Sequence, residues 1–394
     1  MKKSFLLSGF TLCISLYYIS YAAIISYATL FLQMKGFNNT EIGVFYSISS
    51  LLCIVGQIYA GAFLDRHSTL STKIIIISNT LVALMACSIL YFATNRYIMF
   101  ISYVLINMIM LLNSSLFNAF GMEYINAGRS LNYSLSRGFG SLFYAISAFF
   151  TGQFISRFSI SVMFFIFFTV RSALLLSICL LPSAKKESFV TQNRESSDTD
   201  TTKNNFFTLF KENPKLIYLF VSILLIYMSY SSVNNFHINI ISSVGGGSKE
   251  LGISASLAAL LELPVMVIFI PVSRKVSYKT LLKVSCLCFF LKVTAFSMVH
   301  SVFQVYLVQL LQLCSYGLFT PASAYYINSI LADKNKAKGQ TALGIFTFGL
   351  SGVIASMTSG ILLDYISVHH MLVIQSLIAF IGVIGVFRVL KVTD

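Results

Sequence analysis

The chain has 394 residues, of which 57% are hydrophobic and 10% are charged, with a mean hydropathy of +0.82. Soluble chains carry about 25% charged residues, so this composition excludes a soluble globular protein. Apolar stretches of about 18 residues or more recur along the chain, which favours a polytopic helical membrane protein. The net charge of +14 does not indicate a nucleic-acid-binding protein, because the basic residues gather in loops between the apolar stretches.

The apolar stretches predict an all-α membrane protein with twelve transmembrane helices. The first run continues past residue 15 into YYISYAAIISYATLFL, which is too long for the core of a signal peptide, so we expect a retained helix. The predicted spans are 6–33, 42–63, 72–93, 97–125, 134–156, 158–181, 216–242, 251–272, 280–299, 301–329, 340–363 and 368–390.

The basic residues predict the orientation of these spans. Of the 27 Lys and Arg residues, 20 fall on the side of the N-terminus, 4 on the other side and 3 within spans. Because positive charge accumulates on the cytoplasmic side of membrane proteins, both termini are expected in the cytoplasm. We therefore predict a multi-pass protein of the bacterial cytoplasmic (inner) membrane.

The second predicted span ends in GAFLDR, residues 61–66. Gly61 allows close helix approach, and Asp65 can accept hydrogen bonds from helix N-terminal amides or pair with a base; a plain basic turn is the alternative. The motif resembles the G-x-x-x-D-R signature of the major facilitator superfamily, although Ser68 stands where a second glycine is usual. The resemblance implies a transporter fold of two six-helix halves, in which Gly61, Asp65 and Arg66 act in the conformational switch.

Opposite charges flank the loop between the fourth and fifth spans. Glu123 lies near the end of one span and Arg137 near the start of the next, so adjacent antiparallel helices can bring them together. The pattern resembles the lactose-permease-like branch of oligosaccharide and nucleoside proton symporters, and the resemblance implies that Glu123 and Arg137 bind substrate hydroxyls. A structural ion pair between the two helices is the alternative.

A polar segment divides the chain into two parts that resemble each other. We predict an N-terminal six-helix half over 1–182, a cytoplasmic linker over 183–215 and a C-terminal six-helix half over 216–394. The pattern Leu-Phe, six residues, Tyr-Ile-Asn begins at Leu116 and again at Leu318. A repeat of this kind is typical of transporters whose site lies between two halves.

Polar side chains recur at helical spacing in the first, seventh and tenth spans, which line the cavity in the superfamily. They predict a water-filled cavity in which tyrosines stack on a substrate ring and amides bind its hydroxyls. Hydrogen bonding between helices is the alternative. The candidate substrate-binding residues on these spans are Tyr17, Tyr21, Tyr230, Asn234, His237, Gln309 and Gln312, and Tyr227 and Tyr316 share the same spacing.

Further charges lie within the predicted spans. Each costs roughly 2.5–3.5 kcal/mol at membrane depth, so unpaired and unused charges should not persist there. Glu262 and Lys292 are the candidate proton-coupling residues, with a fixed ion pair as the alternative. No role is assigned to Arg171.

These patterns together predict a secondary active transporter, not an enzyme, that takes up a sugar, oligosaccharide or nucleoside with a proton by alternating access. The expected partners are a small polar substrate, a proton and the lipid bilayer, with no nucleic acid, no cofactor and no metal, and the protein is expected to act as a monomer. A drug or metabolite exporter, an uncoupled facilitator and a non-transporting receptor remain as alternatives. The substrate, the direction of transport and the coupling ion are not determined by the sequence.

Overall fold

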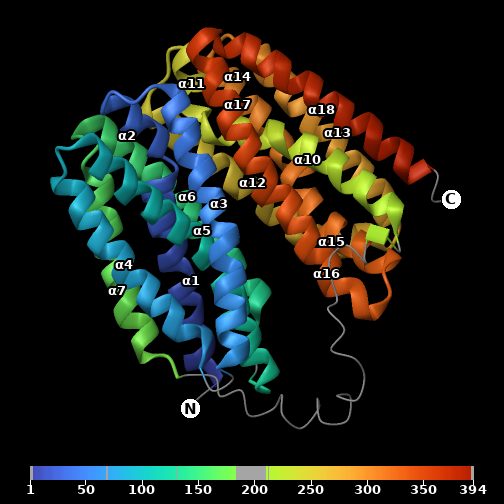
Figure 1. The fold of residues 1–394 in the computed structure, drawn as a ribbon, viewed down its shortest axis with the longest axis horizontal. Coiled ribbons are helices and arrows are strands. Elements are labelled where there is room, and N and C mark those ends of the chain that lie inside the picture. The colour runs from blue at the N-terminus through green and yellow to red at the C-terminus, as the bar shows by residue number, and fades with distance from the viewer. Residues whose placement is uncertain (1–2, 68–69, 130, 183–209, 212, 392–394) are drawn as a thin grey trace. The chain divides into compact units, whose positions relative to one another are not determined.

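The computed structural model describes residues 3–67, 70–129, 131–182, 210–211 and 213–391, and its regular elements in this part of the chain are all helices (Figure 1). The helices before residue 183 are α1 (Lys3–Ile25), α2 (Ala28–Met34), α3 (Asn39–Arg66), α4 (Thr72–Phe92), α5 (Arg96–Asn126), α6 (Tyr133–Arg157) and α7 (Val162–Leu180). Those after residue 212 are α10 (Pro214–Asn235), α11 (His237–Ser243), α12 (Ser248–Ser273), α13 (Tyr278–Ser297), α14 (Val302–Gln309), η1 (Leu310–Gln312), η2 (Leu313–Gly317), α15 (Leu318–Ile330), α16 (Asp333–Gly344), η3 (Ile345–Leu350), α17 (Ser351–Tyr365) and α18 (Val368–Lys391).

The described helices fit a membrane in length and composition, which confirms the prediction of an all-helical membrane protein. Eleven helical stretches, some of which run through two or more of these elements, are long and apolar enough to span a bilayer, and counting the bent α12 as one span gives twelve. The bend of 43° lies between Val265 and Val267, where Pro264 removes a backbone hydrogen bond. Large apolar side chains such as Phe92 and Tyr97 are each 79% exposed, as a lipid-facing surface requires.

Polar residues and glycines set the helix ends. Asn95 caps α5 by accepting from the Tyr97 amide at 2.8 Å, and Ser277 caps α13 by accepting from the Thr280 amide at 3.2 Å. Side-chain oxygens at such positions satisfy amides that have no partner within the helix. Gly128 follows α5 with a φ of 70°, a left-handed conformation that glycine adopts without steric cost.

Contacts between residues divide the chain into two compact units. Unit 1 comprises 1–27 and 51–203, and unit 2 comprises 28–50 and 204–394. The segment 28–50, which carries α2 and the first part of α3, therefore packs with the C-terminal helices. The half boundaries expected from the sequence stay a prediction.

The two units repeat the same aromatic packing. In unit 1 the Tyr17 ring lies 5.0 Å from the Phe117 ring, and in unit 2 the Tyr227 ring lies 4.9 Å from the Phe319 ring. Phe117 and Phe319 are the second residues of the repeated Leu-Phe pattern. Each unit thus joins its first long helix to its fourth through an equivalent contact, as an internal repeat predicts.

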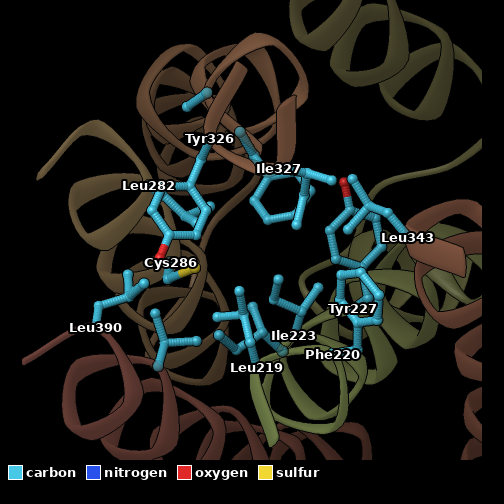
Figure 2. Close-up of a cluster of buried hydrophobic side chains, with 14 of the residues drawn as sticks. Leu219, Phe220, Ile223, Tyr227, Leu282, Cys286, Tyr326, Ile327, Leu343 and Leu390 are labelled. Atoms are coloured by element: carbon cyan, nitrogen blue, oxygen red, sulfur yellow. The ribbon is translucent and has the colours of Figure 1, made fainter. Parts of the chain in front are cut away.

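Apolar packing forms the interior of unit 2. Figure 2 shows side chains from α10, α13, α15, α16 and α18 meeting around one centre. The labelled residues are Leu219, Phe220, Ile223, Tyr227, Leu282, Cys286, Tyr326, Ile327, Leu343 and Leu390. Because lipid is as apolar as these side chains, close packing rather than exclusion of water holds the helices together.

Hydrogen bonds fasten the segment 28–50 to the C-terminal helices of unit 2. The Asp364 carboxylate, at the end of α17, accepts from the amides of Asn39 at 2.9 Å and Thr40 at 2.8 Å. Gln33 donates to the side-chain oxygens of Asn39 and Asn239, both at 3.0 Å. We call these five residues the clasp.

Two glycines bring the backbones together beside the clasp. A methyl group added to Gly43 of α3 would lie 3.3 Å from the Gly360 Cα atom of α17. Small residues at a crossing point of this kind allow close helix contact.

Candidate functional site

Unit 2 brings a buried acid–amide–base group together. Gln312 accepts a hydrogen bond from the Lys292 ammonium at 2.5 Å through Oε1, and donates through Nε2 to Glu262 at 3.0 Å. Lys292 and Gln312 are 3% exposed, and Glu262 is half-buried. The amide therefore links both charges, and its two ends match a donor on one side and an acceptor on the other.

Irregular helix places Gln312 in this group. It ends the 3-10 segment η1, and the π-helical segment η2 begins at the next residue. Both interrupt the hydrogen-bond pattern of the tenth predicted span. Such short π-helical segments occur frequently at functional sites.

Aromatic rings cover the acid–amide–base group. The rings of Tyr230 and Tyr316 stack at 5.2 Å with an interplanar angle of 15°, and Gln312 Nε2 lies 3.5 Å from the Tyr230 hydroxyl. The Lys292 ammonium lies 6.0 Å from the Tyr230 ring centre, within range of a cation–π interaction. The polar faces of the seventh and tenth predicted spans thus meet within unit 2.

A second polar cluster also joins these spans. His237 Nε2 lies 2.7 Å from the Ser254 hydroxyl and 3.2 Å from Gln309 Nε2, and Gln309 donates to Ser254 at 2.9 Å. All three side chains are buried. Asn234, on the preceding turn of α10, is exposed.

In unit 1, the Glu123 carboxylate caps a helix. It accepts from the Ser71 hydroxyl at 2.6 Å, from the Thr72 amide at 2.9 Å and from the Thr72 hydroxyl. Thr72 begins α4, and a carboxylate is stabilised at a helix N-terminus. These contacts, rather than one with Arg137, are those that the structure gives to this carboxylate.

Arg137 lies in a different polar group. Its guanidinium donates to the Asn118 side-chain oxygen at 3.4 Å, and the Tyr133 hydroxyl donates to the same oxygen. Asn118 is exposed and Arg137 is half-buried. This part of unit 1 therefore presents a cation, an amide and a phenol at an accessible surface.

The two candidate tyrosines of α1 differ in accessibility. Tyr17 is 1% exposed and donates to the Met110 carbonyl at 2.6 Å, whereas Tyr21 is half-buried. The structure therefore places Tyr17 in the packed interior of unit 1. The Arg171 guanidinium is fully buried there, 5.7 Å from the Tyr17 ring centre and 3.4 Å from the Ser20 hydroxyl.

The candidate switch residues lie at the end of α3. A methyl group added to Gly61 would meet no described atom within 4 Å, and the role of this glycine stays a prediction. Arg66 is exposed, and the Asp65 side chain lies outside the described residues. Within the described part of the chain, no group of three or more His, Cys, Asp or Glu residues is placed to hold a metal ion.

Sequence reasoning missed Ser254 and Asp364. Ser254 stands in the apolar run ISASLAALLELPVMVIFI, which gave no polar spacing to single it out. In the repeat, Gly152-Gln153-Phe154-Ile155-Ser156 corresponds to Gly360-Ile361-Leu362-Leu363-Asp364, so an acid stands where the other half has a neutral residue. This difference was a usable signal.

These features define a class of protein. Two repeated helical units with membrane-spanning helices, and charged groups held at broken spans, are the features of a secondary transporter. Residues 8–374 match the MFS_1 like family, so the chain belongs to this family of the major facilitator superfamily. It is accordingly a transporter and not an enzyme.

Solved structures share the fold. A mutant of the nucleoside transporter NupG superposes with a TM-score of 0.82 at 14% identity, covering 99% of this chain and 100% of that chain. A bacterial homologue of the human lysosomal transporter Spinster, inward-facing and occupied, has a TM-score of 0.70 at 13% identity, with coverages of 99% and 97%. No curated protein sequence matches the chain. At these identities the likeness establishes the fold alone.

Proposed function

We propose that the protein is a proton-coupled symporter for a polar solute that carries a ring, a nucleoside or a sugar. The observation that carries the proposal is the Gln312 amide, which joins Glu262 to Lys292 beside the stacked rings of Tyr230 and Tyr316. It combines groups that can hold a proton with groups that can hold a polar ring.

Substrate recognition uses the accessible polar side chains of unit 2 and of unit 1. Tyr230 is half-buried and Asn234 is exposed, so a ring can stack on the phenol while the amide bonds its hydroxyls or ring nitrogens. In unit 1, Arg137 and Tyr21 offer similar chemistry. The likeness to the nucleoside transporter NupG makes nucleosides the first substrates to test.

Four of the residues expected to contact substrate are buried in this structure. They are Tyr17, His237, Gln309 and Gln312, so a direct contact would follow a rearrangement. Glu123 is likewise engaged at α4, and its role in substrate binding stays a prediction.

Proton coupling follows from the charge balance of the acid–amide–base group. An isolated carboxylate away from water is costly, so Glu262 favours its neutral form when Gln312 and Lys292 move away. When they return, the amide hydrogen bond and the nearby ammonium favour the charged form, and the proton leaves. A substrate hydroxyl that competes for Gln312 would connect the two events.

We further propose that the protein acts as a monomer in a bacterial cytoplasmic membrane with both termini inside, by alternating access. The bias of basic residues towards one side supports this orientation. The end of α3, with Gly61, Asp65 and Arg66, is the proposed conformational switch on the cytoplasmic side.

Purified protein in lipid vesicles tests the proposal. Labelled nucleosides and sugars are offered with and without an inward proton gradient, and vesicle pH is recorded together with uptake. We expect gradient-driven accumulation of one of these solutes, with Glu262→Gln retaining downhill exchange and losing accumulation. Substrate movement without proton flux at any pH would indicate a facilitator or another ion, and proton-driven efflux would indicate an exporter.

A further inference from the structure

The cluster formed by His237, Ser254 and Gln309 lies apart from the acid–amide–base group. Ser254 precedes Glu262 by about two turns of α12, and Gln309 precedes Gln312 by one turn of the tenth span. The three side chains are 7%, 0% and 4% exposed, respectively. The cluster is thus closed to a solute as large as a sugar.

The hydrogen bonds within the cluster have one consistent direction. Gln309 Nε2 can only donate, and it faces both the Ser254 hydroxyl and His237 Nε2. A proton on His237 Nε2 would therefore point at another N–H group. The imidazole is accordingly neutral with its proton on Nδ1, and its Nε2 accepts from the Ser254 hydroxyl.

Two polar atoms of the cluster have no partner among the described residues. They are His237 Nδ1, a donor in this state, and Gln309 Oε1, an acceptor. A buried polar atom without a partner costs about 1–3 kcal/mol. Two such atoms occur among only three neighbouring side chains. This indicates that the side chains form different hydrogen bonds in another functional state.

Both orphaned side chains stand at interruptions of their helices. His237 begins α11 one residue after the break at Phe236 that ends α10, and Gln309 ends α14 where η1 begins. Interrupted spans hold the ligand and ion sites of many transporters. A metal cation does not fit here, since the cluster offers only the Gln309 and Ser254 oxygens as hard ligands.

We propose that His237 is a second proton-binding group of the transporter, and that the Gln309 amide rotates when His237 gains or loses its proton. This inference rests on the proton coupling of the proposed function. An incoming proton bonds to the lone pair of His237 Nε2. The Gln309 amide then turns, and its Oε1 accepts from the ring N–H or the Ser254 hydroxyl. When the proton leaves, the amide turns back. One proton enters and one leaves, so the charge balances over the cycle.

The charged neighbours link this cluster to the acid–amide–base group. Phe296 faces both, with the His237 ring and the Lys292 ammonium each 5.7 Å from its centre. A protonated His237 would repel Lys292 across this ring. His237 therefore gains a proton most readily while Lys292 is balanced by Glu262 through Gln312. The titratable groups on the helices packed against α11 are Lys215, Tyr218, Tyr227 and Tyr230 on α10, Lys249, Glu250 and Glu262 on α12, and His369, His370, Arg388 and Lys391 on α18.

Nitrogen NMR of the full chain in lipid nanodiscs tests the site directly. The other histidines (His67, His300, His369 and His370) are replaced by Gln, and the remaining ring is labelled with ¹⁵N. We expect the Nδ1–H form at high pH and an imidazolium as pH falls, with the transition moved by Gln309→Leu. A ring that stays neutral at every pH at which the protein is folded overturns the inference, whatever transport shows.

Vesicle transport tests the role of the site in coupling. We expect His237→Gln to reduce proton-driven accumulation by about tenfold or more, because a positioned proton carrier typically contributes at least that much, and to reduce accumulation more than substrate counterflow. Ser254→Ala should have a smaller effect in the same direction, and His300→Gln, an exposed histidine, is the matched control. If the ring titrates but the wild type moves no protons, the proposed function fails while the binding site stands; equal loss of accumulation and counterflow overturns the coupling role.

Discussion

The geometry of the clasp predicts how much more often it opens when Asp364 loses its charge. Asp364 is exposed, and its carboxylate accepts from two amides at the start of α3. Asp364→Asn keeps one acceptor oxygen and removes the charge that faces the helix N-terminus. An exposed charge of this kind contributes about 0.3–1 kcal/mol, which converts to about a two- to fivefold shift in an equilibrium. We expect the clasp to open more often by that factor.

The start of α3 should itself survive this change. Asn38 and Glu41 form reciprocal hydrogen bonds at 2.8 Å, Glu41 Oε2 accepting from the Asn38 amide and Asn38 Oδ1 from the Glu41 amide. This capping box does not involve Asp364, so the helix keeps its own cap. Glu41→Gln is therefore the matched control, because it weakens the helix start and leaves the Asp364 contacts in place.

Thiol labelling measures the opening. Ser47 of α3 is half-buried and donates to the Val353 carbonyl of α17 at 2.8 Å, so a cysteine at this position is shielded while the clasp is closed. In a cysteine-free background, Ser47→Cys should react about two- to fivefold faster with an impermeant maleimide when combined with Asp364→Asn. Unchanged labelling in both Asp364→Asn and Asp364→Ala would refute the role of the clasp.

Three further changes test the other groups. Gln312→Leu should lower the free energy of unfolding by about 1.5–3 kcal/mol, because the buried Lys292 ammonium loses an acceptor; thermal denaturation in detergent measures the loss. Glu123→Gln should destabilise the protein by about 0.5–2 kcal/mol through the α4 cap, and restoration of stability by exchanging the charges of Glu123 and Arg137 would contradict that origin. Arg137→Gln should weaken substrate binding about ten- to a hundredfold at unchanged thermal stability, and equal binding by calorimetry would exclude the contact.

The sequence carried most of the information on the C-terminal polar groups. Helical spacing placed Tyr230, Gln309 and Gln312 on facing sides of two spans, and the structure brings these spans together. The sequence did not show which of these side chains contact each other, because that depends on the rotation of each helix about its axis. Gln312 contacts both Glu262 and Lys292, an arrangement that spacing within single spans does not reveal.

Glu123 illustrates the limit of reasoning from sequence separation. Its spacing from Arg137 across a single loop made that residue the obvious partner. Ser71 and Thr72, more than fifty residues away in the chain, contact it instead. The free amides of a helix N-terminus attract a carboxylate as an arginine does, and no charge marks them in the sequence.

The helix α3 has a mechanical consequence because its residues belong to both units. Residues 39–50 group with unit 2 and residues 51–66 with unit 1, yet they form one unbroken helix. The portion beyond residue 50 is about 24 Å long. A tilt of about 10° around residue 50 would therefore displace Arg66 by roughly 4 Å at this rise per residue. Through this continuous helix, a movement at the clasp would displace the GAFLDR segment at its far end.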